Sequence, residues 1–267
     1  LFSPLAWPML IPPRDWSNDT PGGYLLNEVM KGHDLVRRGD NSLIQGEIPL
    51  DFLNKIQKVA YRLNLFTVKV AEELFSRGIT VGKFLPIVDH DLPPKPPDIE
   101  TNKDSRKSYR RAAAEVMDKR AQEFKRSCRT RMTMEAIRRF LGRDRFYIPW
   151  SFDYRGRAYP IPAFLTPQDT DFGKACIRFA DESYVDAEGE KWLAFQVATT
   201  YGLDKSTMAE RLDWTHNHVS LISQVATDPI DNLPEWEVAE EPWQFLSACD
   251  EYYHCVIKKD RNTTGLC

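Results

Sequence analysis

Apolar residues recur at steps of three and four along much of the chain, which is the spacing of one face of a helix. Over residues 50–76 this spacing predicts one long amphipathic helix, with Asp51 as its N-cap after Pro49. Its apolar face would hold Phe52, Ile56, Val59, Leu63, Phe66, Val70 and Leu74.

Helical spacing returns in three segments of the C-terminal half, at 186–201, 206–226 and 242–255, the last with Pro242 in its first turn. Residues 146–164 are instead rich in aromatic residues and proline, which predicts short strands and turns. Residues 1–24 and 86–98 are punctuated by prolines, so we expect loops there.

Residues 103–145 combine helical spacing with strong positive charge, because they hold 15 Lys and Arg against 6 Asp and Glu, a net charge of +9. Two apolar stripes, Tyr109 to Cys128 and Met134 to Leu141, predict a helical hairpin that Gly142 ends as its C′ residue. Most of the basic side chains would lie outside the stripes, where a partner could reach them.

The net charge of the whole 267-residue chain, only -3, hides this asymmetry. Residues 212–257 contain nine Asp and Glu and no Lys or Arg. Such asymmetry favours a polyanionic partner for the basic block, although a solvated helix face explains a charge run equally well. The length allows one large domain or two ordinary ones, and the composition excludes a disordered, collagenous or disulfide-rich small protein.

The apolar stretch at residues 1–13 is short and contains four prolines, which excludes a membrane span, and it lacks the basic lead of a signal peptide. Five scattered cysteines, an odd number, favour reduced thiols in an intracellular compartment. The chain begins at Leu1 and closes at Cys267 without obvious natural ends. We therefore interpret it as a piece of a longer protein.

Standard catalytic motifs are absent from the sequence: it has no Gly-rich dinucleotide or phosphate loop and no Gly-x-Ser-x-Gly elbow. The candidate ligands for a metal site are His216, His218, Cys249, His254 and Cys255. Their spacing fits no standard zinc pattern, so buried cysteines and surface histidines explain them better.

The strongest chemical motif is Asp153-Tyr154-Arg155-Gly156-Arg157. Gly156 permits a tight turn and close approach of backbone to a ligand. Arg155 and Arg157 carry the planar guanidinium groups that contact phosphate in pairs, and Asp153 could orient one of them. The motif indicates a site for a nucleic-acid backbone, with a purely structural Asp–Arg turn as the alternative.

In this aromatic setting the motif resembles that of the single-subunit, phage-type RNA polymerases, which include the mitochondrial enzymes. Other blocks resemble the same family in the same order over essentially the whole chain. They are Trp7-Pro-Met-Leu-Ile-Pro-Pro, Gly22-Gly-Tyr, Lys95-Pro-Pro-Asp-Ile with Tyr109-Arg-Arg-Ala-Ala-Ala, Phe172-Gly-Lys, Gly202-Leu-Asp-Lys and Glu241-Pro-Trp-Gln-Phe-Leu.

The resemblance implies an α+β fold, predominantly α-helical, with a helical thumb and the start of the antiparallel palm sheet of a right-hand polymerase. It implies the end of an N-terminal domain over 1–71, a basic thumb over 72–148, and the beginning of the palm with following helices over 149–267. The activity implied is template-dependent RNA synthesis, in a monomeric parent enzyme with DNA template, RNA transcript and nucleoside triphosphates as partners and no membrane.

The resemblance also implies roles for single residues. Lys205 would approach the triphosphate of the incoming nucleotide. Nucleic acid would be contacted by Asp153, Arg155, Gly156, Arg157, Lys174, Arg110 and Arg111. The aspartates that hold Mg²⁺ in the family would lie beyond Cys267, so no catalytic or metal-binding residue is expected here, and Asp250 and Glu251 match no metal ligand of the family.

Two other interpretations stay open. The chain could be a non-catalytic module that binds nucleic acid through its basic helices. It could also be a structural protein whose arginines pair with its own acidic block. For the polymerase, the resemblance implies the host cytoplasm if the source is a phage and the mitochondrion if it is an organelle.

Overall fold

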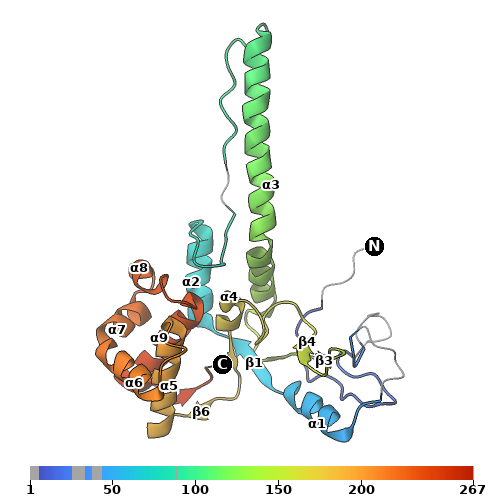
Figure 1. Ribbon diagram of the computed structural model, residues 1–267, viewed down its shortest axis with the longest axis vertical. Helices are drawn as coiled ribbons and strands as arrows, with labels where there is room; N and C mark the ends of the chain where they lie inside the picture. The colour runs from blue at the N-terminus through green and yellow to red at the C-terminus, as the bar shows by residue number, and fades with distance from the viewer. Residues whose placement is uncertain (1–5, 26–33, 38–43, 88–89, 267) are drawn as a thin grey trace.

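A computed structural model of the chain describes residues 6–25, 34–37, 44–87 and 90–266. A long helix, α3, rises from a base in which two lobes flank its foot (Figure 1). One lobe contains α5 to α9, and the other contains α1 with the β3–β4 hairpin. Long helices and small antiparallel sheets together make an α+β fold, which confirms the predicted class.

The predicted single helix over residues 50–76 is wrong, because a strand divides it. Helix α1 spans Glu47–Ile56, strand β1 Ala60–Leu63, and helix α2 Leu65–Ser76. Strand β1 pairs with two neighbours in a three-stranded sheet, and Asn64 then caps α2 by accepting a hydrogen bond from the Thr67 N–H. Asp51 is not an N-cap; it lies inside α1 and pairs with Lys55 at 2.7 Å.

The predicted helical hairpin of the basic block is also wrong. Helix α3 runs unbroken through Lys103–Phe140, because no glycine or proline interrupts these 38 residues. Asn102 caps its start, and Gly142, at φ 77°, follows its end as the C′ residue predicted. The predicted stripe fails midway, since Phe124 and Cys128 are exposed while Ser127 and Thr130 are buried.

The described residues of the proline-rich segment, 86–87 and 90–98, lie along α3 as an extended strap (Figure 1). Described residues of the predicted loop at 86–98 form no helix or strand, which confirms that prediction. The Arg120 Nε donates a hydrogen bond to the His90 carbonyl at 2.7 Å, and the Ser105 hydroxyl donates one to the Asp98 carboxylate at 2.7 Å. Both bonds attach the strap to the helix.

Short antiparallel sheets connect the lobes to the foot of α3. The first has the order β2-β1-β5, with β2 at Phe146–Tyr147 and β5 at Ile177–Phe179. Strand β3, Trp150–Phe152, pairs with β4, Ala158–Pro160, so the strands and turns predicted for 146–164 are confirmed. Strands β6, Ser183–Tyr184, and β7, Thr263–Thr264, form a third pair.

The helical lobe begins with α5 at Ala187–Tyr201 and includes α8 at Leu233–Trp236, α9 at Pro242–Tyr252 and the π-helix η1 at Tyr253–Ile257. The predicted helix over 206–226 is two helices, α6 at Met208–Asn217 and α7 at Val219–Thr227. They break at His218, whose ring stacks on Trp214 and whose Nδ1 lies 2.6 Å from the Trp214 carbonyl oxygen.

Helix α9 fills the centre of the lobe, and nearly all of its side chains are buried. Trp243 packs against Phe84 and Phe172, each with ring centroids 4.8 Å away. Phe172 belongs to α4, Asp171–Ala175, so this aromatic cluster joins the lobe to the middle of the molecule. Within the described ranges, no helix combines the length and the apolar character that crossing a bilayer requires.

Asp171 caps α9 from a different helix, because its carboxylate accepts hydrogen bonds from the backbone N–H of Trp243 at 2.9 Å and of Gln244 at 3.0 Å. Burial raises the pKa of Asp171 from 3.8 to about 6, although these hydrogen bonds oppose the shift. The charge of Glu241 raises the pKa further. The folded state therefore binds the Asp171 proton more tightly than the unfolded state does.

This sign leads to a pH prediction. The stability that Asp171 contributes should be fully present below about pH 4 and should be lost as the pH rises through about 6. Carboxyl-detected NMR should find one aspartate titrating near pH 6, and Asp171→Asn should remove that signal and flatten the decline in unfolding free energy between pH 4 and 6. An Asp171 titration near pH 4 would contradict the prediction.

Candidate nucleic-acid interface

The Asp153–Arg157 motif forms the turn of the β3–β4 hairpin. Phe152 and Ala158 are the last paired residues before the turn, and the Asp153 N–H donates to the Arg157 carbonyl at 2.8 Å. Gly156 lies at φ 78°, a conformation that other residues rarely adopt, and a Cβ there would meet nothing within 4 Å. The glycine is therefore needed for the backbone conformation, since space is available on that side.

The Asp153 carboxylate holds this turn together. One oxygen accepts the backbone N–H groups of Arg155 and Arg157, each at 2.9 Å, and the other accepts Nε and Nη2 of Arg155 at 3.1 and 3.0 Å. Desolvation raises the pKa of Asp153, but these hydrogen bonds outweigh it and hold the pKa below its ordinary value. The carboxylate is thus ionised at neutral pH and orients Arg155.

The turn presents its polar groups to solvent. Tyr154 is 78% exposed, and the Arg155 guanidinium lies 5.4 Å from the centre of its ring. Arg157 is also exposed. An aromatic ring and two guanidinium groups on a fixed turn can stack on bases and contact phosphates.

Arg37 supports the hairpin from a distant part of the sequence. Its Nε donates to the Ser151 hydroxyl at 2.9 Å, its backbone N–H donates to the Phe152 carbonyl at 2.7 Å, and its guanidinium lies over the Tyr159 ring. Sequence reasoning missed this residue, because its partner Ser151 lies 114 residues away and no local pattern links the two.

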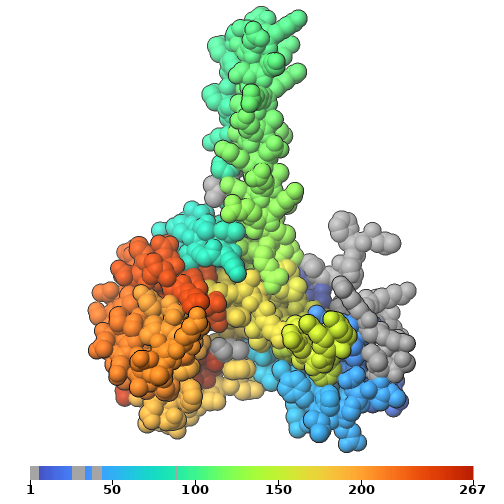
Figure 2. All heavy atoms as spheres, in the orientation of Figure 1, coloured from blue at the N-terminus to red at the C-terminus, as the bar shows by residue number. Residues whose placement is uncertain are grey.

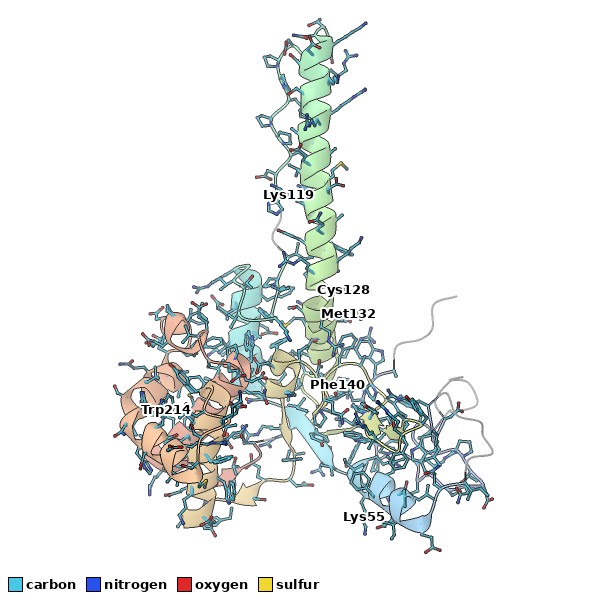
Figure 3. The ribbon with its side chains drawn as sticks, in the orientation of Figure 1. Lys55, Lys119, Cys128, Met132, Phe140 and Trp214 are labelled. Atoms are coloured by element: carbon cyan, nitrogen blue, oxygen red, sulfur yellow. The ribbon has the colours of Figure 1, made fainter. Side chains whose placement is uncertain are left out.

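Helix α3 presents the second group of predicted residues. Arg110 and Arg111 lie in its outer half and are exposed, and Arg111 forms an i,i+4 pair with Glu115 at 3.5 Å. At 1.5 Å per residue the 38-residue helix is about 57 Å long. Figure 2 shows the helix as a narrow column. Figure 3 labels Lys119 part-way along it. The cations of its outer half, Arg110 and Arg111 among them, are therefore held well away from the base.

The foot of α3 is fixed by a buried carboxylate that the sequence did not reveal. Arg129 donates to Asp169 and to the Ala163 carbonyl, the latter at 2.7 Å. The other Asp169 oxygen accepts the Leu165 N–H at 3.0 Å. A Cβ at position 173 would lie 2.3 Å from the Asp169 carboxylate, so the carboxylate can occupy this place only because residue 173 is glycine. These bonds fix the direction in which the column projects.

The two predicted lysines lie on other elements. Lys174, partly exposed, is in the last turn of α4, and Lys205 is exposed in the connection between α5 and α6. Of the predicted residues, the structure brings only Asp153, Arg155, Gly156 and Arg157 into one local cluster. Arg110, Arg111, Lys174 and Lys205 are distributed over the column, the middle and the helical lobe.

Asp250 and Glu251 are buried in α9 and form ion pairs. Glu251 accepts from Arg178 at 2.9 Å and from Arg261 at 2.7 Å, and Asp250 lies 3.6 Å from His254. In the part of the chain that the structure describes, no three His, Cys, Asp or Glu side chains gather as a metal site. His218 and His254 instead bond the Trp214 carbonyl and the Asp260 carboxylate.

Known proteins resemble this chain along most of its length. A family model described as DNA-dependent RNA polymerase matches residues 183–264. The DNA-directed RNA polymerase of Enterobacteria phage T3 is 30% identical over 94% of this chain. The chain is similar to part of the DNA-directed RNA polymerases of phages and organelles. The T7 RNA polymerase of Escherichia phage T7 is 29% identical over 94% of the chain. A chloroplastic/mitochondrial DNA-directed RNA polymerase of Arabidopsis thaliana is 29% identical over 91%.

The polymerase relationship extends along nearly the whole chain, but the chain covers only 29% of the phage T3 and T7 relatives and 24% of the Arabidopsis relative. Its similarity therefore concerns one part of those enzymes. The named relatives come from phages and from organelles, so they do not define a single compartment.

Proposed function

We propose that this chain is part of a DNA-directed RNA polymerase and holds the DNA template and RNA transcript next to the active site. One observation carries the proposal: similarity to such polymerases extends over 91–94% of the chain. The basic column α3 and the exposed arginine turn give that similarity a physical counterpart, because both present cations suited to phosphate.

In this proposal residues 72–148 are the thumb and α3 is its projecting helix. Residues 149–267 begin the palm and its supporting helices, and residues 1–71 end the N-terminal domain. The continuous α3 supports this assignment. A rigid helix that is fixed at Arg129 and Asp169 can lie alongside a duplex bound to the two lobes.

The residue roles follow from position and charge. Arg155 and Arg157 contact the backbone of the template or hybrid, with Asp153 and Gly156 shaping their turn. Arg110, Arg111 and Lys174 contact phosphates further along, and Lys205 approaches the triphosphate of the incoming nucleotide. Each of these cations is exposed or partly exposed, as phosphate contact requires.

Mg²⁺ is the cofactor proposed for the whole enzyme, where it would activate the 3′-hydroxyl and stabilise the leaving pyrophosphate. The described residues gather no donor set that fits it, and Asp250 and Glu251 are already paired with arginines. The resemblance to the family places its ligands beyond Cys267, so the proposal assigns no catalytic step to these residues. The parent enzyme is proposed to be monomeric and intracellular.

In the structural alternative, the chain's arginines pair with its own acidic block. Arg178 and Arg261 do pair with Glu251 of that block, but both lie outside the basic block. In the part of the chain that the structure describes, arginines of residues 103–145 pair with Glu115, Glu135, Asp169 and Asp181. All four carboxylates lie outside residues 212–257. The column therefore keeps cations available for another molecule.

The arginine turn provides the direct test. Arg155→Ala with Arg157→Ala should weaken binding of the chain to a fluorescent RNA–DNA hybrid by roughly ten- to a hundredfold, since each change removes a charge-assisted phosphate contact. Fluorescence anisotropy measures the change. Lys55→Ala with Lys83→Ala removes the same charge from exposed sites elsewhere and should shift affinity by less than about threefold.

Equal weakening by both pairs would count against a specific role for the turn. The natural gene product should also incorporate labelled ribonucleotides on a DNA template. Hybrid binding without any incorporation would instead support the non-catalytic binding module.

A further inference from the structure

An unassigned cavity of about 570 Å³ lies where β1, β5, the C-terminal end of α3 and α9 meet. Its size suits a small ligand. Its lining residues are 62–66, 140, 142–145, 178, 180, 250 and 261, so it is separate from the β3–β4 turn and from the outer half of α3. None of the nucleic-acid residues predicted from the sequence lines it.

Guanidinium groups dominate its charged lining. Five arginines and two aspartates line the cavity, namely Arg62, Arg143, Arg145, Arg178, Arg261, Asp144 and Asp250. The first turn of α2 also lines it and contains no acidic residue, so the positive end of that helix adds to the potential. We call this cavity the arginine pocket.

Carboxylates behind the arginine pocket hold its inner guanidinium groups in place. Glu182 binds both Arg62 and Arg178, and Glu251 binds both Arg178 and Arg261. Two carboxylates thus order three arginines in a chain of shared ion pairs. Burial raises the pKa of Asp250, and the charges of Arg261 and His254 oppose that shift.

The mouth of the arginine pocket is formed by exposed side chains after α3. Arg143 is exposed, and Arg145 is half exposed, 3.6 Å from Asp181. A ligand can therefore reach these two without displacing buried groups. Exposed cations at the mouth and ion-paired cations inside together attract an anion.

We propose that the arginine pocket binds phosphate groups. Guanidinium pairs match phosphate oxygens geometrically, and the cavity accommodates a diphosphate or a short stretch of strand backbone. Both sources present the same chemistry, and the experiment below separates them. The inference does not depend on the proposed polymerase role, because it concerns residues to which that role assigns nothing.

Isothermal titration with inorganic pyrophosphate tests the pocket. We expect saturable binding by the 267-residue chain, and at least tenfold weaker binding by Arg143→Ala with Arg145→Ala. Both side chains lie at the surface, so the variant should keep the thermal unfolding midpoint of the parent, and the single Arg143→Gln variant is a milder second probe. Lys55→Ala with Lys83→Ala is the charge-matched control.

Competition by a short single-stranded RNA without terminal phosphates identifies the source: displacement of pyrophosphate indicates a strand backbone, and no displacement indicates a small polyphosphate. The inference is overturned if pyrophosphate does not saturate, or if Arg143→Ala with Arg145→Ala binds it within twofold of the parent. Arg155→Ala with Arg157→Ala should leave pyrophosphate binding unchanged, so failure of the pocket and failure of the polymerase proposal give different patterns.

Discussion

Replacement of Glu251 by alanine should lower the free energy of unfolding by about 3–5 kcal/mol, because it removes one member of a buried ion-pair network. The Glu251 side chain is only 3% exposed and accepts hydrogen bonds from Arg178 and Arg261. Arg178 is itself only 12% exposed, so its guanidinium would keep a buried charge with fewer partners. Urea denaturation of parent and variant at the same pH measures the difference.

A matched control is available in Glu237, an exposed glutamate of the same acidic region. Glu237→Ala should change the unfolding free energy by less than about 0.5 kcal/mol. Glu251→Gln should fall between the two, since an amide oxygen still accepts one guanidinium bond. A loss below about 1 kcal/mol for Glu251→Ala would show that the network contributes little.

This network also explains why carboxylates that looked tempting in the sequence have another role. Adjacent Asp250 and Glu251 suggest metal ligands when read alone. Their partners Arg178 and Arg261 are separated from them by up to 73 residues, and no local pattern reveals the pairing. The resemblance to the family assigned no metal to them, and that assignment stays a prediction.

The helix predictions succeeded where the signals for the helix are local to its own sequence. Residues 187–201 and 242–252 were predicted almost to the residue, because each has capping or proline signals and a face buried against neighbouring helices. Residues 60–63 were missed, since their apolar spacing fits a helix equally well. These residues form strand β1 because they pair with β2 and β5. The local sequence does not reveal such distant pairing partners.

Helix α3 shows the opposite error. Its apolar residues form two stripes, Tyr109 to Cys128 and Met134 to Leu141, which suggested two helices. The chain between Lys103 and Phe140 nevertheless contains no glycine or proline that would end a helix. The buried face follows Ser127, Thr130 and Thr133 at the foot, where small polar residues allow close contact with the base. Polar residues at core positions are hard to recognise from hydrophobicity alone.

For the candidate site, the sequence predicted the turn at Asp153–Arg157 because its chemistry is local to five residues. Arg37, the Arg129–Asp169 contact and the arginine pocket were missed, because each depends on contacts between distant segments. Local motifs are thus visible in the sequence, whereas the groups that position them require the fold.

Binding of the chain to an RNA–DNA hybrid should be steeply salt-dependent. If Arg110, Arg111, Arg155, Arg157 and Lys174 each neutralise one phosphate, the logarithmic slope is about -4.5, and affinity falls roughly 500-fold between 50 and 200 mM salt. Arg110→Ala with Arg111→Ala removes two contacts, so its slope should be about -2.7 and its fall roughly 40-fold.

Anisotropy titrations at four salt concentrations measure both slopes, with Lys55→Ala and Lys83→Ala as the charge-matched control whose slope should equal that of the parent. A parent affinity that is constant with salt would exclude phosphate contacts as the basis of binding. An unchanged slope in the α3 variant would place the contacts elsewhere. Because Arg110 and Arg111 lie far out on a rigid helix, a reduced slope would require the hybrid to extend along the column.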